Sequence, residues 1–138
     1  MAFPNRSDDI MATCMSTAVT DKLTLGRLAE DSACQYLARN GLKLIARNYK
    51  CRRGEIDLVM RHNDSIVFIE VRYRHNNHFG SGAESVINRK QKKIILTALH
   101  YLQSHKEAAG LSCRFDVIAV QPGPDKNHIQ WIQDAFQA

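Results

Sequence analysis

The sequence predicts an α/β domain whose elements follow the order α-β-β-β-α-β-β. Two segments carry apolar residues at helical spacing, several short segments are alternating or rich in β-branched residues, and no repeat or linker divides the chain. With 138 residues, of which 44% are hydrophobic and 24% charged, the chain can bury one core. We expect a single domain over residues 21–138 after a flexible lead-in over residues 1–20.

The composition excludes several classes of protein. No apolar run approaches the ~20 residues of a membrane-spanning helix, and the N-terminus lacks the basic-then-apolar pattern of a signal peptide. The four cysteines are scattered without a Cys-x-x-Cys pair, which argues against a zinc site or a disulfide framework. We therefore expect a cytoplasmic protein with no membrane contact.

The first helix is expected from Thr24 to Asn40, with Gly41 as a left-handed cap. Glu30 lies at the edge of its apolar stripe, and a carboxylate that faces inward needs a partner. Two alternatives stay open: Glu30 joins other acids in a site, or it pairs with an arginine such as Arg47. The stripe itself consists of Leu25, Leu28, Ala29, Ala33, Tyr36 and Leu37.

Three strands are expected next. Residues 42–50 alternate, and a basic turn containing Arg52 and Arg53 follows them. The apolar runs 56–60 and 66–71 then flank a polar segment, which is the pattern of a β-hairpin. A two-residue loop at Asn63 and Asp64 would fix the register of this hairpin.

That register places Asp57 directly opposite Glu70. Side chains at such a pair lie ~5 Å apart across the strands, where two like charges are destabilising. Two carboxylates at that distance need a proton or a cation between them, and a divalent ion with oxygen ligands fits. The same register sets Glu55 against Arg72, for which a ladder salt bridge is as good an interpretation as a functional role.

The second helix is expected to begin at Asn88, where Gln91 completes a capping-box pattern. Lys90 lies on the same side as the apolar stripe and is expected to point towards the hairpin, whereas Lys92 and Lys93 are expected on the surface. The stripe consists of Ile94, Ile95, Ala98, Leu99 and Leu102.

Two further strands are expected over residues 113–120 and 128–133. Arg114 and Asp116 lie on one face of the first strand, where mutual pairing is the preferred interpretation. Trp131 is expected to pack on the sheet.

The net charge is +5 and the pI is near 9.2. Between Arg47 and Lys93 there are eleven lysines and arginines against five acidic residues, so the basic residues concentrate around the carboxylate pair. Such a concentration is typical of a surface that binds a polyanion, although a generic basic surface is an alternative.

These features together carry a resemblance. The strings Gly54-Glu55-Ile56-Asp57-Leu58 and Phe68-Ile69-Glu70-Val71-Arg72-Tyr73-Arg74, with the two helices that bear Glu30 and Lys90, resemble the YraN family of uncharacterised bacterial proteins. That family is similar to archaeal Holliday-junction resolvases and to the wider PD-(D/E)XK nuclease superfamily. The resemblance implies a restriction-endonuclease-like core, a mixed β-sheet flanked by helices, in a single nuclease-like domain.

The resemblance also implies a site. Asp57 and Glu70 would hold Mg²⁺ or Mn²⁺, with the backbone carbonyl of Val71 and the helix acid Glu30 as further ligands. The catalytic group would comprise Asp57, Glu70, Arg72 and Lys90. The candidate contacts to nucleic acid are Arg52, Arg53, Arg74, Lys90 and Lys93. A junction-cutting enzyme needs two sites, which implies a homodimer.

The superfamily usually has lysine where this chain has Arg72. Arginine stays protonated, so Arg72 cannot act as a general base, and Lys90 would supply a lysine instead. The resemblance thus implies a metal-dependent endonuclease that hydrolyses phosphodiester bonds in structured or branched DNA. Two alternatives remain: a nucleic-acid-binding protein without catalytic activity, or a protein-interaction factor.

Overall fold

The computed structural model describes residues 22–74, 88–108 and 110–138, so the lead-in expected over residues 1–20 lies outside the described part. The fold is α/β, and its main elements follow the expected order α-β-β-β-α-β-β, with a short 3-10 helix added before the fourth strand. The elements are α2 (Lys22–Arg39), β1 (Lys43–Cys51), β2 (Gly54–His62), β3 (Ser65–Tyr73), α3 (Asn88–Ser104), η2 (Lys106–Ala108), β4 (Ser112–Gln121) and β5 (His128–Phe136).

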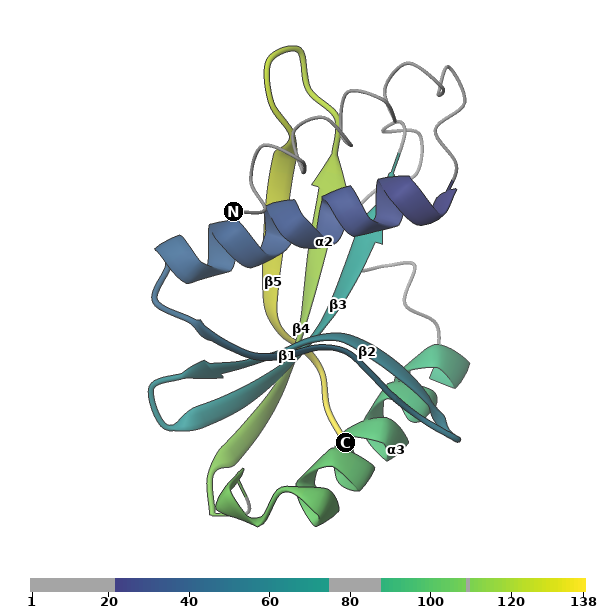
Figure 1. Ribbon diagram of the computed structural model, residues 1–138, viewed down its shortest axis with the longest axis vertical. Coiled ribbons are helices and arrows are strands. Elements are labelled where there is room, and N and C mark those ends of the chain that lie inside the picture. Colours follow the sequence, from purple (N-terminus) through teal and green to yellow (C-terminus); the bar gives the residue numbers. More distant parts are fainter. Residues whose placement is uncertain (1–21, 75–87, 109) are drawn as a thin grey trace, which may run out of the picture.

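The strands form one mixed sheet in the order β1-β2-β3-β4-β5. Neighbouring strands are antiparallel except β3 and β4, which are parallel and are connected through α3. Helix α2 crosses the strands on one side of the sheet and α3 lies on the other (Figure 1). None of the helices in the described ranges combines the length and the apolar character needed to cross a membrane.

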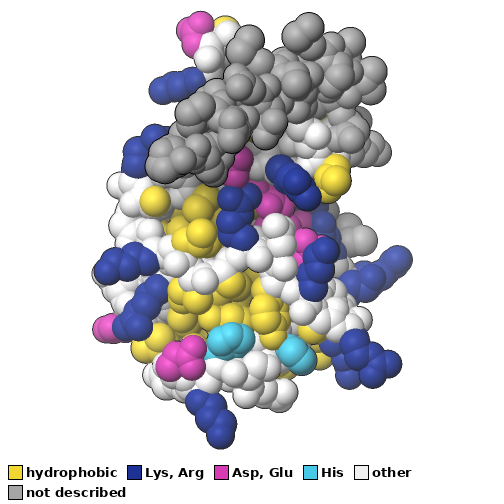
Figure 2. Space-filling model, viewed as in Figure 1, with side chains coloured by type: hydrophobic (Ala, Val, Ile, Leu, Met, Phe, Trp, Pro, Cys, Tyr) yellow, Lys and Arg dark blue, Asp and Glu magenta, His cyan; other side chains and the backbone are white. Residues whose placement is uncertain are grey.

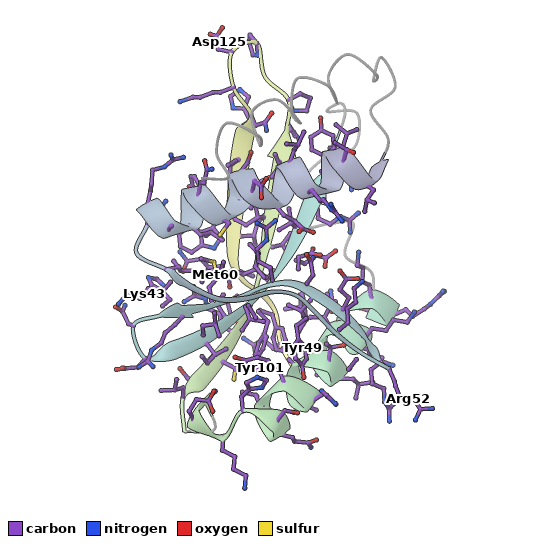
Figure 3. The ribbon with its side chains drawn as sticks, viewed as in Figure 1. Lys43, Tyr49, Arg52, Met60, Tyr101 and Asp125 are labelled. Atoms are coloured by element: carbon purple, nitrogen blue, oxygen red, sulfur yellow. The ribbon has the colours of Figure 1, made fainter. Side chains whose placement is uncertain are left out.

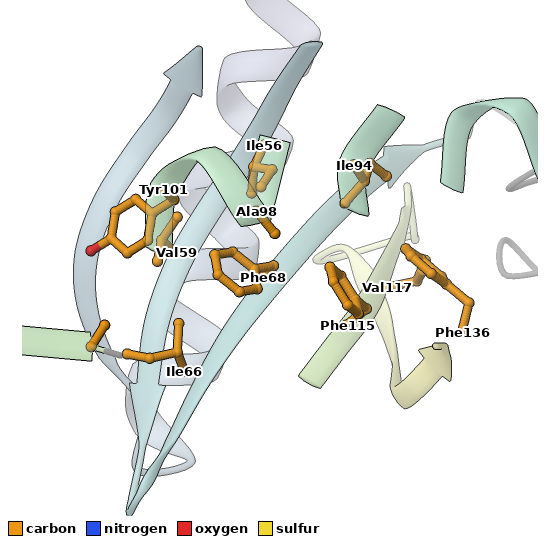
Figure 4. Packing of buried hydrophobic residues seen from close by; sticks show 11 residues of the cluster. Ile56, Val59, Ile66, Phe68, Ile94, Ala98, Tyr101, Phe115, Val117 and Phe136 are labelled. Carbon is orange, nitrogen blue, oxygen red and sulfur yellow. The ribbon is translucent and has the colours of Figure 1, made fainter. Parts of the chain in front are cut away.

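Two hydrophobic layers cover the two faces of the sheet. The layer beneath α3 contains Phe68, Tyr101 and Phe115 among other buried side chains (Figure 4). The layer beneath α2 contains Leu37, Val67 and Ile69. Strand β3 supplies alternate residues to both layers, because successive side chains of a strand point to opposite faces. Strand β3 is therefore buried on both faces.

The helices bury narrower stripes than the sequence suggested. In α2 the buried line is Ala29, Ala33 and Leu37, and the two alanines let the helix approach the sheet closely. Leu28 was expected in this stripe but is 53% exposed, because it lies about 100° around the helix from Ala29. Gly41 has φ 95°, which confirms the left-handed cap.

The stripe of α3 is likewise rotated from the expected one. Ile94, Thr97, Ala98 and Tyr101 are buried, whereas Leu99 is 49% exposed. Tyr101 is one of the largest buried side chains, and its ring lies among those beneath the helix.

Two contacts join the edge strand and the β1–β2 turn to α3. Tyr49 of β1 packs edge-to-face on Tyr101, with ring centroids 5.1 Å apart (Figure 3), and its hydroxyl lies 2.6 Å from Nδ1 of His100. At the end of the turn, a Cβ placed on Gly54 would lie only 3.2 Å from the Thr97 hydroxyl oxygen. The turn that carries Arg52 and Arg53 is therefore held closely against the middle of α3.

The expected pairing of Arg114 with Asp116 is confirmed at 2.9 Å. Asp116 is 1% exposed and accepts further hydrogen bonds from the Trp131 indole and from the backbone N–H of Asp134, each at 2.9 Å. This buried network fastens β5 to β4 where their register shifts, so it has a structural role.

Candidate functional site

The register of the β2–β3 hairpin agrees with the sequence prediction. The paired Cα positions run from Leu58↔Ile69 to His62↔Ser65, and Asn63 in the turn has φ 57°. In this register Asp57 and Glu70 form the next pair, one position beyond the end of the ladder. Beyond that point the β1–β2 hairpin curves away from β3 (Figure 1).

The carboxylate of Asp57 lies where the two strands separate. Its Oδ2 accepts a hydrogen bond from the backbone N–H of Val71 at 2.8 Å. The side chain thus binds a backbone donor of β3 just past the last paired position. Asp57 is thereby held next to Glu70, the residue before Val71 in the chain.

A local break in strand alternation directs these side chains. Ile56 belongs to the layer beneath α3 and Leu58 to the layer beneath α2, although they are two residues apart. On β1, Arg47 and Asn48 are consecutive, yet both reach carboxylates of α2. Asn48 has φ 52°, a conformation that asparagine tolerates better than most residues. The role of Asn48 was not predicted. The only signal for it in the sequence is its residue type, because asparagine is one of the residues that tolerate a positive φ.

Burial strongly perturbs Asp57. It raises the pKa of this carboxyl, and the nearby charge of Glu70 raises it further. The hydrogen bond from Val71 opposes these effects, while Glu30 and Glu55 add smaller upward contributions, giving a pKa of about 8. Asp57 is thus crowded by negative charge from three other carboxylates.

Glu70 is 6% exposed and has a cationic partner. The Lys90 ammonium lies 2.5 Å from its Oε2. Lys90 is in the first turn of α3, so its side chain points to the hairpin as the sequence predicted. This ion pair connects α3 to the carboxylate pair.

Glu30 has the arginine partner that was one of its two predicted alternatives. The Arg47 guanidinium lies 3.3 Å from Glu30 and 2.8 Å from Asp31. The amide of Asn48 donates to Glu30 at 3.2 Å and to Glu55 at 3.4 Å. Glu55 and Arg72, expected to face each other, lie beyond the paired positions of β2 and β3.

Across residues 22–74, 88–108 and 110–138, no group of three His, Cys, Asp or Glu side chains is arranged to hold a metal ion. The chemistry of Asp57 and Glu70 nevertheless fits a hard cation, since a buried carboxyl whose pKa is raised by a second one gains from a positive charge between them. Glu30, another expected ligand, is paired with Arg47 at 3.3 Å.

A small cavity adjoins this carboxylate group. It has a volume of about 210 Å³ and lies between the start of α2 and the β1–β2 hairpin. Arg27 and Lys50, neither of which was singled out in the sequence, line it together with Glu30, Asn48 and Glu55. Figure 2 shows acidic side chains near the middle of this face with lysine and arginine side chains around them.

The structure brings together three of the five expected nucleic-acid contacts away from the carboxylates. Arg52 and Arg53 are exposed in the β1–β2 turn, from which Arg52 extends outward (Figure 3). Lys93 is exposed on α3, with its Cβ 3.5 Å from the Cβ position of Gly54. Lys90 lies with Glu70, and Arg74 directly follows β3, where its N–H donates to Val120.

Comparison with solved structures gives a match to one described as the crystal structure of SSO0001. The TM-score is 0.38 at 12% sequence identity, and the match covers 99% of this chain and 62% of that chain. A similarity at this level supports no argument about function.

Comparison with curated proteins is more informative. A UPF0102 protein of Nitrosococcus oceani is 46% identical over 112 residues, covering 81% of this chain and 90% of its own. Another, of Methylobacillus flagellatus, is 52% identical over 114 residues, covering 83% and 97%. The model of the uncharacterised protein family UPF0102 matches residues 29–120, which include both strands of the carboxylate pair. The chain therefore belongs to this uncharacterised family, the YraN-type family that its sequence resembles.

Proposed function

We propose that this protein is a metal-dependent endonuclease that hydrolyses phosphodiester bonds in structured or branched DNA, with Mg²⁺ or Mn²⁺ as its cofactor. The observation that carries the proposal is the arrangement of Asp57, Glu70 and Lys90. Two carboxylates meet where β2 separates from β3, and an ammonium group is in contact with one of them. The names of the relatives carry no activity, so the proposal rests on this geometry and on the resemblance of the motifs.

Different residues of the chain would have different roles in this reaction. Asp57 and Glu70 would hold the cation, which when bound polarises the phosphodiester and lowers the pKa of an attacking water. Lys90 would contact the phosphate and stabilise the charge that develops on it. Arg52, Arg53 and Lys93 would bind phosphates farther along the DNA, since they lie together on the exposed β1–β2 turn and on α3.

Arg72 would hold a phosphate or water through charge and geometry, because a guanidinium does not give up its proton at working pH. A lysine at the site comes from α3 instead of from β3, since Lys90 contacts Glu70 directly. This placement supports catalysis in spite of the arginine at position 72.

The test is cleavage of junction, flap and single-stranded DNA in Mg²⁺ or Mn²⁺ by the wild type, Asp57→Asn and Glu70→Gln. Each variant should lose activity by on the order of 100-fold or more, because each removes a carboxylate that would hold the cation. Lys90→Gln should also cleave more slowly.

The matched control is Asp64→Asn in the hairpin turn, which removes the same charge from a side chain that is 98% exposed. It should cleave like the wild type. The proposal fails if none of the substrates is cut in either metal, or if Asp57→Asn cuts as fast as Asp64→Asn.

A second candidate function is DNA binding without cleavage, which the arginine at position 72 favours. In that case binding would not need a divalent cation and would weaken steeply with salt. Asp57→Asn would then bind DNA at least as well as the wild type. Gel-shift titrations with EDTA and with Mg²⁺ separate the two functions.

A further inference from the structure

The carboxylate of Glu70 already has a cationic partner in this fold. The Lys90 ammonium lies 2.5 Å from Oε2, and the carboxylate is 6% exposed. The Lys90 side chain is 46% exposed, so it has room to leave the carboxylate. A divalent ion would therefore meet a glutamate that is already neutralised by a lysine.

We propose that Lys90 competes with the divalent cation for Glu70, so that this lysine keeps the site closed to metal until the cation displaces it. The inference rests on the proposed function for the identity of the cation site, and it adds how access to that site is controlled. The displaced ammonium, anchored in the first turn of α3, is then available to the phosphate of the substrate.

The competition has two physical sources. The first is the charge-assisted hydrogen bond of Lys90 to Glu70, which occupies one side of Oε2 and makes this oxygen a poorer metal ligand. The second is the repulsion between an ammonium and a divalent cation at close range, which is strong near a buried carboxylate. Removing the positive charge at position 90 should therefore strengthen metal binding, which is the reverse of what loss of an ordinary site residue does.

The experiment is calorimetric titration of the full chain with Mn²⁺ and with Mg²⁺. Lys90→Gln should bind the metal on the order of ten-fold more tightly than the wild type, a coupling of ordinary size between two ligands. Lys90→Arg keeps the charge and should stay close to the wild-type affinity. Lys92→Gln removes the same charge from an exposed position on the same helix and should change the affinity by much less.

A second readout follows the lysine itself. In protein with ¹³C-labelled lysine, the Cε signal missing from Lys90→Gln identifies Lys90. Adding Mg²⁺ to the wild type should shift this signal, because the ammonium leaves Glu70, and Glu70→Gln should abolish the effect. Circular dichroism checks that each variant is folded.

The inference is overturned if Lys90→Gln binds metal equally or more weakly than the wild type, or if no variant binds metal. Failure of the proposed function looks different. Tighter metal binding by Lys90→Gln without DNA cleavage by any of the proteins would support the competition and exclude the nuclease activity. DNA cleavage by the wild type, together with an unchanged metal affinity in Lys90→Gln, would support the nuclease activity and exclude the competition.

Discussion

At the scale of one residue, the position of Asp57 suits a bound cation but makes its ionised carboxylate unfavourable for the stability of the fold. Its carboxyl is buried beside Glu70, and its pKa is raised from 3.8 to about 8. Between those values the unfolded chain carries an ionised Asp57 while the folded chain keeps a proton on it. Folding then takes up a proton, so the free energy of unfolding falls as pH rises through this window.

Asp57→Asn should therefore stabilise the protein, because the amide cannot ionise and its oxygen can still accept from Val71. The gain should be small near pH 4 and largest at pH 8 and above, where we expect a rise of several degrees in Tm. Thermal unfolding in EDTA across this pH range checks the prediction. Asp64→Asn should show no such pH-dependent gain, and an equal gain in both variants would contradict the assignment.

At the scale of elements, Gly54 joins the β1–β2 turn to α3. It has φ 158°, and an added Cβ would lie 3.2 Å from the Thr97 hydroxyl oxygen and 3.5 Å from the Cβ of Lys93. A side chain on residue 54 would push against the Thr97 hydroxyl, so glycine favours this close approach of the turn to the helix. That approach brings the turn that carries Arg52 and Arg53 close to the helix residue Lys93.

Gly54→Ala should lower the free energy of unfolding by about 1 to 3 kcal/mol, since the new methyl group meets α3 in a backbone conformation that favours glycine. Gly26→Ala is the comparison, because Gly26 lies within α2 and an added Cβ meets nothing within 4 Å. That variant should gain about 0.5 to 1 kcal/mol. Urea unfolding monitored by the fluorescence of the single tryptophan measures both, and equal effects would argue against the close contact.

The elements also show which features a sequence can predict. The register of β2 and β3 followed from two apolar runs and a two-residue polar turn, and it was correct because one slip would turn every buried side chain to the wrong face. The partners of Asp116 did not follow in the same way. Arg114 is two residues away and was predicted, but the Trp131 indole and the N–H of Asp134 arrive from β5 through a register shift that no local pattern specifies.

The residues of the candidate site were likewise only partly predictable from the sequence. Asp57, Glu70 and Lys90 could be placed together because strand pairing and helix periodicity are local rules. The partner of Glu30 could not be decided, because Arg47 reaches it only through the break in alternation at Asn48. That break arises where two strands and a helix pack together.

At the scale of the whole molecule, charge is unevenly distributed. The net charge is +5, yet the carboxylates of Glu30, Asp57 and Glu70 gather at the centre of a surface whose turn and helix are basic. A polyanion would be attracted by the surrounding lysines and arginines and would approach the carboxylates only through a cation.

Replacing Arg52, Arg53 and Lys93 together with glutamine should weaken DNA binding and reduce the salt dependence. Loss of three phosphate contacts should make the slope of log K against log salt less negative by about 2 to 3. The control replaces Arg39, Lys43 and Lys126, three cations outside the basic turn, and should leave the slope nearly unchanged. Fluorescence anisotropy at several salt concentrations measures both, and equal slopes would contradict the proposed DNA-binding surface.

The parallel pairing of β3 with β4 has a consequence for the order of folding. Asp57 and Glu70 belong to a hairpin closed by a two-residue turn. Lys90 instead lies on α3, in the connection between the parallel strands β3 and β4, whose paired residues, such as Ser65 and Ser112, are distant in the chain. Local hairpins form faster than long-range parallel contacts. The nascent chain should therefore bring its two acids together before their lysine docks, so the two carboxylates meet without their cationic partner early in folding.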